Sequence, residues 1–451
     1  MSHSVGLLTP LLYAAPRQEL SADEAVLAAA LRAELSLSRA LVKQGLASAK
    51  DLAVIESAAE LRWFSVTELA AQAVRGGNFI IPLVEQLKSR VEAQLPGASW
   101  LVHPGATSQD ILDSALILVS KSVSTEVISH ISATQRSLIS LAELHRERLC
   151  AARTLTQPSV PYTWGLRFSQ WLQTLTLAKN QLQKWSDDAP MQWGGASGTN
   201  AALNARFGSD SASLIVQDAA ADLELCLPEL PWHSNRSPMV SLATALAAVN
   251  TALGTIANNI VLLSRPEFGE LAEGLGEGHG GSSAMPQKRN PIQSIMLRSA
   301  ISPVPALTAE IIRLSMTVDE RSDGAWQAEW PILQQLLQIT QATSASAEKL
   351  IAGLSVVPKA IGLDERLGWS LVSERLMQEL GPKIGAKRVK ELLLHGQEHG
   401  SSLPEVLSVS VPELFSTIEE AQDFCRPELY LGQSDQLITR AIRFAQKSLG
   451  E

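Results

Sequence analysis

Cysteine is scarce in this chain, which has three cysteines among 451 residues. Cys150, Cys226 and Cys425 are odd in number and lie far apart, so they do not form the framework of a disulfide-stapled protein. A free cysteine most often packs as a small hydrophobic side chain. We expect that role for each of the three, rather than the role of a nucleophile.

Positive charge is also in short supply. Lys and Arg total 37 against 46 Asp and Glu, which gives a formal net charge of −9 and a pI near 5.5. This balance excludes the basic surface on which nucleic-acid-binding proteins depend, so no nucleic-acid partner is expected. The N-terminal residues lack the basic stretch and apolar run of a secretion signal, and we expect a cytoplasmic protein.

Long uninterrupted hydrophobic runs are missing as well. The most apolar stretch has a 4-3 repeat that runs through Leu242, Leu246, Val249, Leu253, Ile256, Ile260 and Leu263. Asn250, Asn258 and Asn259 interrupt this stretch. A repeat of this kind is typical of a helix that packs along other long helices, so we expect a buried bundle helix and no membrane partner.

Period-two alternation and hairpin dipeptides are scarce too, which indicates an all-α fold. A helix is predicted to begin near Thr107 or Ser108, and Ser21 and Glu24 are spaced as a capping box. Further helical periods cover roughly residues 126–149, 166–186, 292–316 and 332–352. Proline and glycine breaks divide the chain into an N-terminal helical domain (1–106), a central long-helix bundle (107–354) and a C-terminal helical domain (355–451).

One segment is rich in glycine and ends in cations. Residues 274–281 hold five glycines in eight positions, and Ser282, Ser283, Lys288, Arg289 and Asn290 follow closely. Such a segment favours a mobile loop that closes over a small anionic substrate, whereas the alternative is a flexible linker with a basic end. Residues 276–281 also fit G-x-G-x-x-G, but a helical pattern and several glutamates precede them. We therefore expect no dinucleotide cofactor.

Three segments carry a family resemblance. Residues 281–291, G-S-S-A-M-P-Q-K-R-N-P, resemble the signature loop of the fumarase/aspartase superfamily. Residues 103–110, H-P-G-A-T-S-Q-D, and 153–165, R-T-L-T-Q-P-S-V-P-Y-T-W-G, resemble two further signatures in the family's chain order. The resemblance implies three helical domains and a homotetramer with a twenty-helix core, in which three subunits supply each site. It also implies β-elimination or its reverse, without cofactor or metal.

The residue at position 155 narrows the chemistry. The family has a histidine there that serves the leaving group in several members, and this chain has Leu155. An amine or hydroxide leaving group needs a general acid. A carboxylate, whose parent acid has a pKa of about 4, needs none. The chain also resembles bacterial 3-carboxy-cis,cis-muconate cycloisomerase in residues 77–84, 105–113, 193–199, 231–234 and 320–330. This implies conversion of 3-carboxy-cis,cis-muconate to 4-carboxymuconolactone, as in the protocatechuate branch of the β-ketoadipate pathway.

The resemblance also implies roles for individual residues. Ser282 is the family's proton-transfer position, and Lys288 would stabilise the negative charge that develops on the substrate. The residues that would bind the polycarboxylate substrate are His103, Thr107, Ser108, Thr156, Gln157, Ser283, Met285, Arg289 and Asn290. His233 is either a residue of the site or a satisfied core histidine.

Two other functions stay open. One is another lyase of the superfamily with a weakly basic leaving group, such as a nitrosuccinate or substituted-succinate lyase, and adenylosuccinate lyase is a weaker candidate. The other is a catalytically retired homologue with a structural or binding role, because Leu155 replaces a catalytic histidine.

Overall fold

The computed structural model describes residues 6–274, 285, 288–357, 365–399 and 401–451. Over these residues the chain is helical with only short antiparallel strand pairs, so the predicted all-α class is confirmed. The chain forms two units. The first comprises Met1–Ile131, Ala178–Leu253 and Ser299–Ser346, and the second comprises Ser132–Leu177, Gly254–Arg298 and Ala347–Glu451. The division into three domains stays a prediction.

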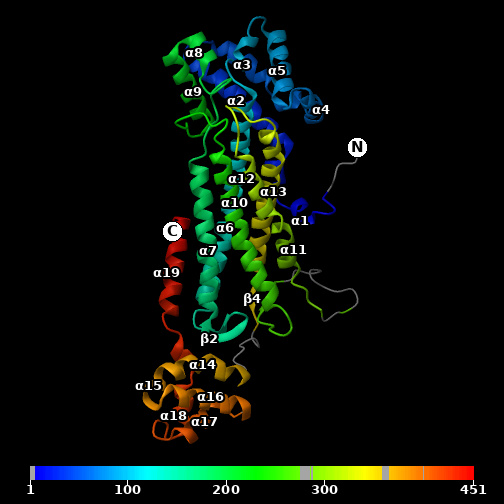
Figure 1. Cartoon of the computed structure of the whole chain (residues 1–451). Coiled ribbons are helices and arrows are strands. Elements are labelled where there is room, and N and C mark those ends of the chain that lie inside the picture. The colour runs from blue at the N-terminus through cyan, green and yellow to red at the C-terminus, as the bar shows by residue number, and fades with distance from the viewer. Residues whose placement is uncertain (1–5, 275–284, 286–287, 358–364, 400) are drawn as a thin grey trace. The chain divides into compact units, whose positions relative to one another are not determined.

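The four longest helices among the described residues supply residues to both units (Figure 1). They are α6 (Ser108–Leu144), α7 (Trp164–Asp187), α10 (Ser237–Leu263) and α13 (Ala325–Ala352). The predicted start near Thr107 or Ser108 is confirmed, but α6 continues without a break into the period predicted at 126–149. Every residue from 109 to 120 is buried, so α6 begins as a helix that is enclosed on all sides.

The apolar repeat in α10 is buried in full. Each of its seven Leu, Val and Ile side chains is at most 2% exposed, which confirms the predicted bundle helix. By length and composition α10 could also cross a membrane, as could Ile292–Leu314. The most apolar window of α10 is 56% buried inside the structure, and that of Ile292–Leu314 is 22% buried. Two such helices are weak evidence for membrane spans, because the core helix of a soluble protein passes the same test.

The first unit also contains shorter helices. They are α1 (Pro10–Tyr13), α2 (Asp23–Lys43), α3 (Ala49–Ala58), α4 (Val66–Gly76), α5 (Ile80–Gln94), α8 (Ala201–Phe207), α9 (Ser209–Leu223) and α12 (Val304–Leu314), with 3-10 turns at Gln18–Ser21, Leu61–Trp63 and Ser99–Leu101. Helix α2 packs against α3, α4 and α9, and its Leu27, Leu31 and Leu37 are buried (Figure 1).

Two helix predictions are corrected here. The Ser21–Glu24 capping box is wrong, because α2 begins at Asp23 after Ala22 and the Ser21 hydroxyl donates instead to Gln341, 3.3 Å away. The single helix predicted over 292–316 is divided into α11 (Ile292–Ile301) and α12 (Val304–Leu314). Pro303 lies at the break, where its missing N–H and its ring favour the end of a helix.

The second unit has two strand pairs and its own core. Strand β1 (Leu149–Thr154) pairs with β2 (Gln157–Thr163), and β3 (Leu271–Ala272) pairs with β4 (Ser355–Val356). The helices are α14 (Glu365–Glu379), α15 (Gly381–Ile384), α16 (Ala386–His399), α17 (Leu403–Ser410), α18 (Ile418–Phe424) and α19 (Ser434–Leu449), with a 3-10 turn at Pro427–Tyr430. Val372, Leu376, Leu407 and Phe415 pack together in the core of this unit. The β1–β2 hairpin was not predicted, because its turn is Leu155-Thr156.

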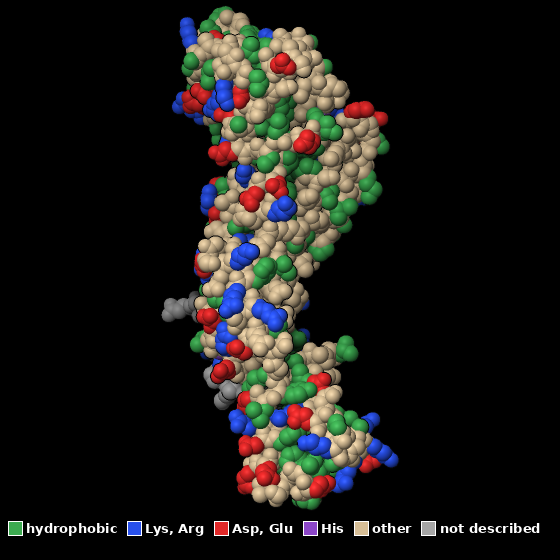
Figure 2. Space-filling model, turned by 90° about the vertical axis from the view of Figure 1, so that its left-hand side faces the viewer, with side chains coloured by type: hydrophobic (Ala, Val, Ile, Leu, Met, Phe, Trp, Pro, Cys, Tyr) green, Lys and Arg blue, Asp and Glu red, His purple; other side chains and the backbone are tan. Residues whose placement is uncertain are grey.

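The cysteines differ in environment. Cys150 is buried and Cys425 is partly buried, and burial raises the pKa of each thiol to about 12. The expectation is wrong for Cys226, which is exposed. On the face drawn in Figure 2, basic and acidic side chains are interspersed and do not separate into patches of one sign.

Candidate active site

The beginning of α6 presents two hydroxyl groups. Thr107 precedes the helix and Ser108 is its first residue. The Thr107 hydroxyl oxygen accepts a hydrogen bond from Nη1 of Arg321 at 2.7 Å. Because that oxygen is the acceptor, the hydroxyl hydrogen stays available to donate to an anion. The positive end of the α6 dipole and the Arg321 guanidinium both favour an anion at this point.

Asp110 lies in the first turn of α6, where its negative charge would oppose a bound anion. Its carboxylate is fully buried and accepts from four donors: the N–H groups of Thr107 (3.0 Å) and Gly195 (2.9 Å), Nε2 of Gln192 (3.1 Å) and Nε2 of His233 (2.8 Å). Four hydrogen bonds of this kind stabilise the ionised Asp110 carboxylate in its buried position. Asp110 therefore anchors the helix start to two distant segments and leaves the outer side to Thr107 and Ser108.

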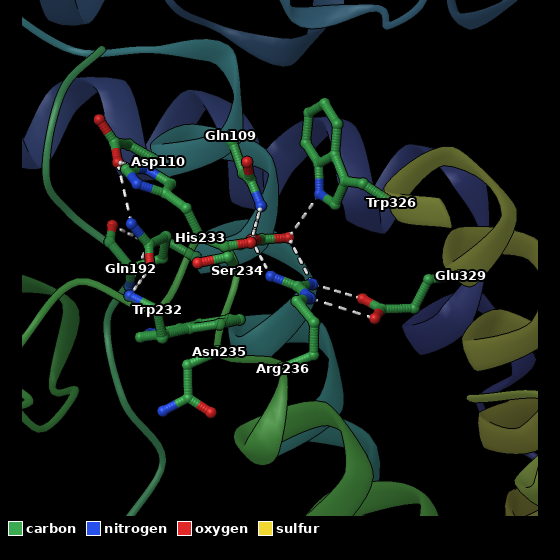
Figure 3. Close-up of polar contacts among 12 residues, drawn as sticks. Gln109, Asp110, Gln192, Trp232, His233, Ser234, Asn235, Arg236, Trp326 and Glu329 are labelled. Atoms are coloured by element: carbon green, nitrogen blue, oxygen red, sulfur yellow. Dashed lines mark hydrogen bonds and ion pairs between the residues drawn. The ribbon is translucent and has the colours of Figure 1, made fainter. Parts of the chain in front are cut away.

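His233 belongs to this buried network (Figure 3). Its side chain is 4% exposed and bonded to Asp110, and its backbone carbonyl accepts from Nε2 of Gln109 at 2.9 Å. The two readings of His233 are thus decided in favour of a satisfied core histidine. It supports the site through Asp110.

His103 precedes α6 and has a different partner. Its backbone has a φ of +59°, and its Nδ1 lies 2.6 Å from the buried carboxylate of Glu34 on α2. Burial disfavours the charged imidazolium, but the attraction and hydrogen bond of Glu34 outweigh it, so the pKa of His103 is raised. This pair therefore anchors the segment that leads to Thr107 to α2.

A buried ionic cluster contacts α6 near its beginning, through Asp113 (Figure 3). The Arg236 guanidinium forms two hydrogen bonds with Asp113, at 2.6 and 3.1 Å, and two with Glu329, one of them at 3.2 Å. Asp113 also accepts from Nε1 of Trp326 at 2.9 Å. Burial raises the pKa of Glu329 although Arg236 opposes the rise, and the two carboxylates outweigh the burial of Arg236 and raise its pKa. All three charged side chains are at most 1% exposed.

The role of Arg321 was not predicted from the sequence. This arginine donates to Thr107 and, through Nη2, to the carbonyl oxygen of Ala196 at 2.7 Å. It therefore joins the helix start to the glycine-rich connection 193–199, which also supplies the Gly195 N–H to Asp110. Both segments were singled out only as resemblances. A side chain that lies 214 residues from its partner has no local sequence signal.

The hairpin tip in the second unit carries three motif residues. Leu155 and Thr156 are the two turn residues between β1 and β2, with φ of +49° and +73°. Two consecutive positive φ values define a type I′ turn, which usually has Asn-Gly. Leu155 is 96% exposed, and Thr156 and Gln157 are exposed beside it. Arg153, near the end of β1, donates to the buried Glu270 through Nη1 and Nη2 of its guanidinium.

The signature loop is described in part. Ser282 and Ser283 lie outside the described residues, whereas Met285, Lys288 and Arg289 are exposed and Asn290 is half-buried. Glu273, before the loop, accepts the N–H groups of Gln293 (3.1 Å) and Ser294 (2.8 Å) in the first turn of α11. This carboxylate thus joins the two ends of the loop at the beginning of a helix, where anions are favoured.

The structure brings the predicted residues together within each unit. His103, Thr107 and Ser108 share the connection into α6 in the first unit. In the second unit Thr156 and Gln157 are adjacent on the hairpin tip, and Lys288, Arg289 and Asn290 are adjacent in the loop. Within the described ranges, no three His, Cys, Asp or Glu side chains gather as metal ligands would.

Comparisons with known proteins agree with this arrangement. Residues 9–305 match the protein family described as Lyase. The chain is 35% identical to nitrosuccinate lyase of Streptomyces davaonensis, over 97% of this chain and 94% of that protein. It is 32% identical to 3-carboxy-cis,cis-muconate cycloisomerase of Bradyrhizobium diazoefficiens, over 97% of both. The crystal structure of 3-carboxy-cis,cis-muconate lactonizing enzyme from Pseudomonas putida superposes with a TM-score of 0.86 at 29% identity, over 98% of each chain.

Proposed function

Because the chain belongs to the fumarase/aspartase superfamily of lyases and cycloisomerases, we propose that it converts 3-carboxy-cis,cis-muconate to 4-carboxymuconolactone. The observation that carries the proposal is Leu155. It occupies the hairpin tip between Thr154 and Thr156, and its side chain has no proton to give. A site that includes this tip suits a leaving group that departs without a general acid.

The lactonisation can be assigned step by step to residues of the signature loop. In the lactonising direction, an oxygen of one substrate carboxylate forms a bond to the carbon β to a second carboxylate. The electron pair of the double bond moves onto that second carboxylate as an aci-carboxylate. Lys288 and Asn290 stabilise this charge, and the Ser282 hydroxyl then delivers a proton to the α-carbon. The nucleophile is already ionised and bound, so proximity supplies much of the rate.

The remaining carboxylates need positive charge and donors. In this proposal Thr107 and Ser108 donate to one of them at the beginning of α6, where Arg321 adds positive charge. Thr156 and Gln157 donate to another from the hairpin tip. The roles of Ser283, Met285 and Arg289 in substrate binding rest on the family motif.

The proposal includes a homotetramer in which three subunits supply the three motifs of one site. Exposed apolar surface supports it, because the stretch Ile292–Leu314 is apolar enough for a membrane helix and only 22% of its most apolar window is buried in the single chain. Surfaces of this kind on a soluble protein mark contacts with other chains. Light scattering coupled to size exclusion will give the mass in solution.

A second candidate function is nitrosuccinate lyase. The nitrosuccinate lyase of Streptomyces davaonensis is 35% identical over 97% of this chain. This similarity is the specific observation that favours the second candidate. The Leu155 argument applies to this reaction as well. Nitrite is a weak base, so its departure from the β-carbon needs no general acid.

One set of assays separates these possibilities. With 3-carboxy-cis,cis-muconate, the purified protein should remove the ultraviolet absorbance of the diene, and activity should persist in EDTA. With nitrosuccinate, release of nitrite would favour the second candidate. Cleavage of argininosuccinate or adenylosuccinate instead, or a requirement for added metal or NAD, would contradict both.

A matched pair of variants checks that the activity belongs to this site. Lys288→Ala removes the charge that stabilises the aci-carboxylate and should slow turnover by about a hundredfold or more. Lys387→Ala removes a lysine on α16 whose side chain is 92% exposed, and its activity should equal that of the wild type. Equal activity in the two variants would remove Lys288 from the proposed mechanism.

A further inference from the structure

The hairpin tip of the second unit is both exposed and strained. Thr154, Leu155, Thr156 and Gln157 are all exposed. Leu155 and Thr156 have positive φ, a conformation that costs energy for residues other than glycine. Strain of this kind persists only where the surrounding structure imposes it, and it clusters at functional sites. The tip therefore needs an anchor elsewhere in the second unit.

The two donors on the tip are already oriented by a hydrogen bond between them. Nε2 of Gln157 donates to the hydroxyl oxygen of Thr156 at 3.3 Å. Because that oxygen is the acceptor, the hydroxyl hydrogen of Thr156 stays available to donate to an anion. The same pattern occurs at Thr107, whose hydroxyl oxygen accepts from Arg321. A substrate carboxylate at the tip would thus meet donors that the tip backbone holds in place.

Arg153 is the residue of β1 closest to the tip that is not itself exposed. Its side chain is 15% exposed, its Nη1 donates to Oε2 of Glu270 at 3.1 Å, and its Nη2 donates to Oε1 of the same carboxylate. Two parallel hydrogen bonds fix the plane of a guanidinium as well as its position. The guanidinium carbon also lies 4.8 Å from the ring centroid of Phe268. Arg153 is therefore held in one orientation directly before Thr154.

Glu270 is a rigid partner because its own backbone is bonded on both sides. Its N–H donates to the carbonyl oxygen of Leu263 at the end of α10 (2.8 Å), and its carbonyl oxygen accepts from the N–H of Val357 (3.0 Å). Arg167 on α7 lies 3.9 Å from the Glu270 carboxylate and donates to the carbonyl oxygen of Ala151 in β1 at 2.9 Å. One buried carboxylate thus faces two guanidinium groups that both hold β1.

We propose that Arg153, fixed by Glu270 and Phe268, is a positioning residue that sets the hairpin tip so that Thr156 and Gln157 can donate to a carboxylate of the substrate. The inference rests on the proposed function, in which these two residues bind a carboxylate other than the one on which negative charge develops. Misplacing the tip should therefore raise KM much more than it lowers kcat.

The first test measures KM and kcat of Arg153→Met with 3-carboxy-cis,cis-muconate, or with nitrosuccinate if that is the substrate turned over. The variant leaves Arg167 as the counter-charge of Glu270, so it should fold. We expect KM to rise about tenfold and kcat to stay within about twofold of the wild type. Arg153→Lys keeps the charge but loses the paired hydrogen bonds, so its KM should lie between those two values.

Arg375→Met is the matched control. Arg375 is largely buried in the second unit, donates to Glu379 at 2.9 Å and lies 4.5 Å from the ring centroid of Phe424. It thus loses the same kind of contacts as Arg153→Met, but among the helices α14 and α18. Arg375→Met should lower Tm and keep the wild-type KM. An equal rise in KM would mean that lost stability, and not the position of the tip, causes the effect.

A second comparison shows whether Arg153 acts through the tip. Replacing Thr156 and Gln157 together with alanine removes both donors and should itself raise KM by at least about tenfold. Adding Arg153→Met to this double variant should raise KM no further, because no donor remains to be positioned. A further rise of about tenfold, or an unchanged KM in Arg153→Met alone, would overturn the proposal.

Hydrogen exchange separates a failure of this inference from a failure of the proposed function. Without substrate, the backbone amides of residues 150–163 should exchange faster in Arg153→Met than in Arg375→Met. Equal exchange would show that Arg153 does not hold the tip, whatever the reaction. If neither substrate is turned over, the proposed function is wrong, and the exchange rates alone decide whether Arg153 holds the tip. Wild-type KM in the alanine double variant would remove the tip from the substrate site.

Discussion

Replacing Arg236 with methionine tests the importance of the buried ionic cluster. The variant leaves Asp113 and Glu329 buried without their shared counter-charge, while the methionine occupies a similar volume. Removing one partner of a buried ion pair costs roughly 3–5 kcal/mol, because a charge stays in the protein interior uncompensated. All three side chains are at most 1% exposed, so solvent screening does not reduce this figure. For a chain of 451 residues this corresponds to a fall in Tm of about 3–5 °C.

The sign of the pH dependence gives a second measurement. Without Arg236, burial raises the pKa of the Glu329 carboxyl in the folded protein further above its unfolded value of about 4.3. The folded state of the variant then binds more protons than the unfolded state between these two pKa values. Its stability therefore decreases as pH rises through that interval, and the deficit relative to the wild type shrinks on acidification.

Calorimetric melts of both proteins at about pH 5.5 and about pH 8 would measure the two effects. Arg313→Met is the control, because Arg313 forms an exposed ion pair with Glu310 on α12 and its loss should leave Tm unchanged. Adding Glu329→Gln to Arg236→Met should recover part of the lost stability, since one buried charge disappears. A shift no larger than that of Arg313→Met, or a deficit that grows on acidification, would refute the reasoning.

Three further predictions concern the active site. Ser282→Ala should lower kcat by at least about a hundredfold with an unchanged melting curve. A loss of this size from Ser283→Ala, with no loss from Ser282→Ala, would show that the Ser283 hydroxyl transfers the proton. Leu155→His should give no gain in lactonisation, so a clear rise in kcat with a new pH dependence near about 6.5 would identify the wild type as an impaired lyase. The pair of His103 with Glu34 should stabilise the fold fully below about pH 6.5 and lose its contribution as pH rises through the raised pKa of His103. Tm of His103→Gln should therefore approach that of the wild type at high pH, and a gap that widens instead would argue against a charged His103.

Helical periodicity and local composition were enough to predict the framework. The 4-3 repeat in α10 specifies one apolar face, and that face is buried in the structure. The start of α6 could be placed because Thr107 and Ser108 favour helix N-termini by bonding to local backbone. Both signals arise within a few residues of chain. The three motifs likewise lie in short segments, and these identified the superfamily before any contact was known.

The partners of buried polar groups were decided only by tertiary structure. Asp110 meets His233 across 123 positions, and Arg321 meets Thr107 across 214. The need of a buried charge for a partner is general, but which side chain meets it depends on how distant helices pack. The Leu155-Thr156 turn shows the same limit, because neither residue favours positive φ and strand pairing imposes the conformation on them. Sequence thus determined the helices and the motif chemistry, whereas packing determined which side chains hold the motif residues in place.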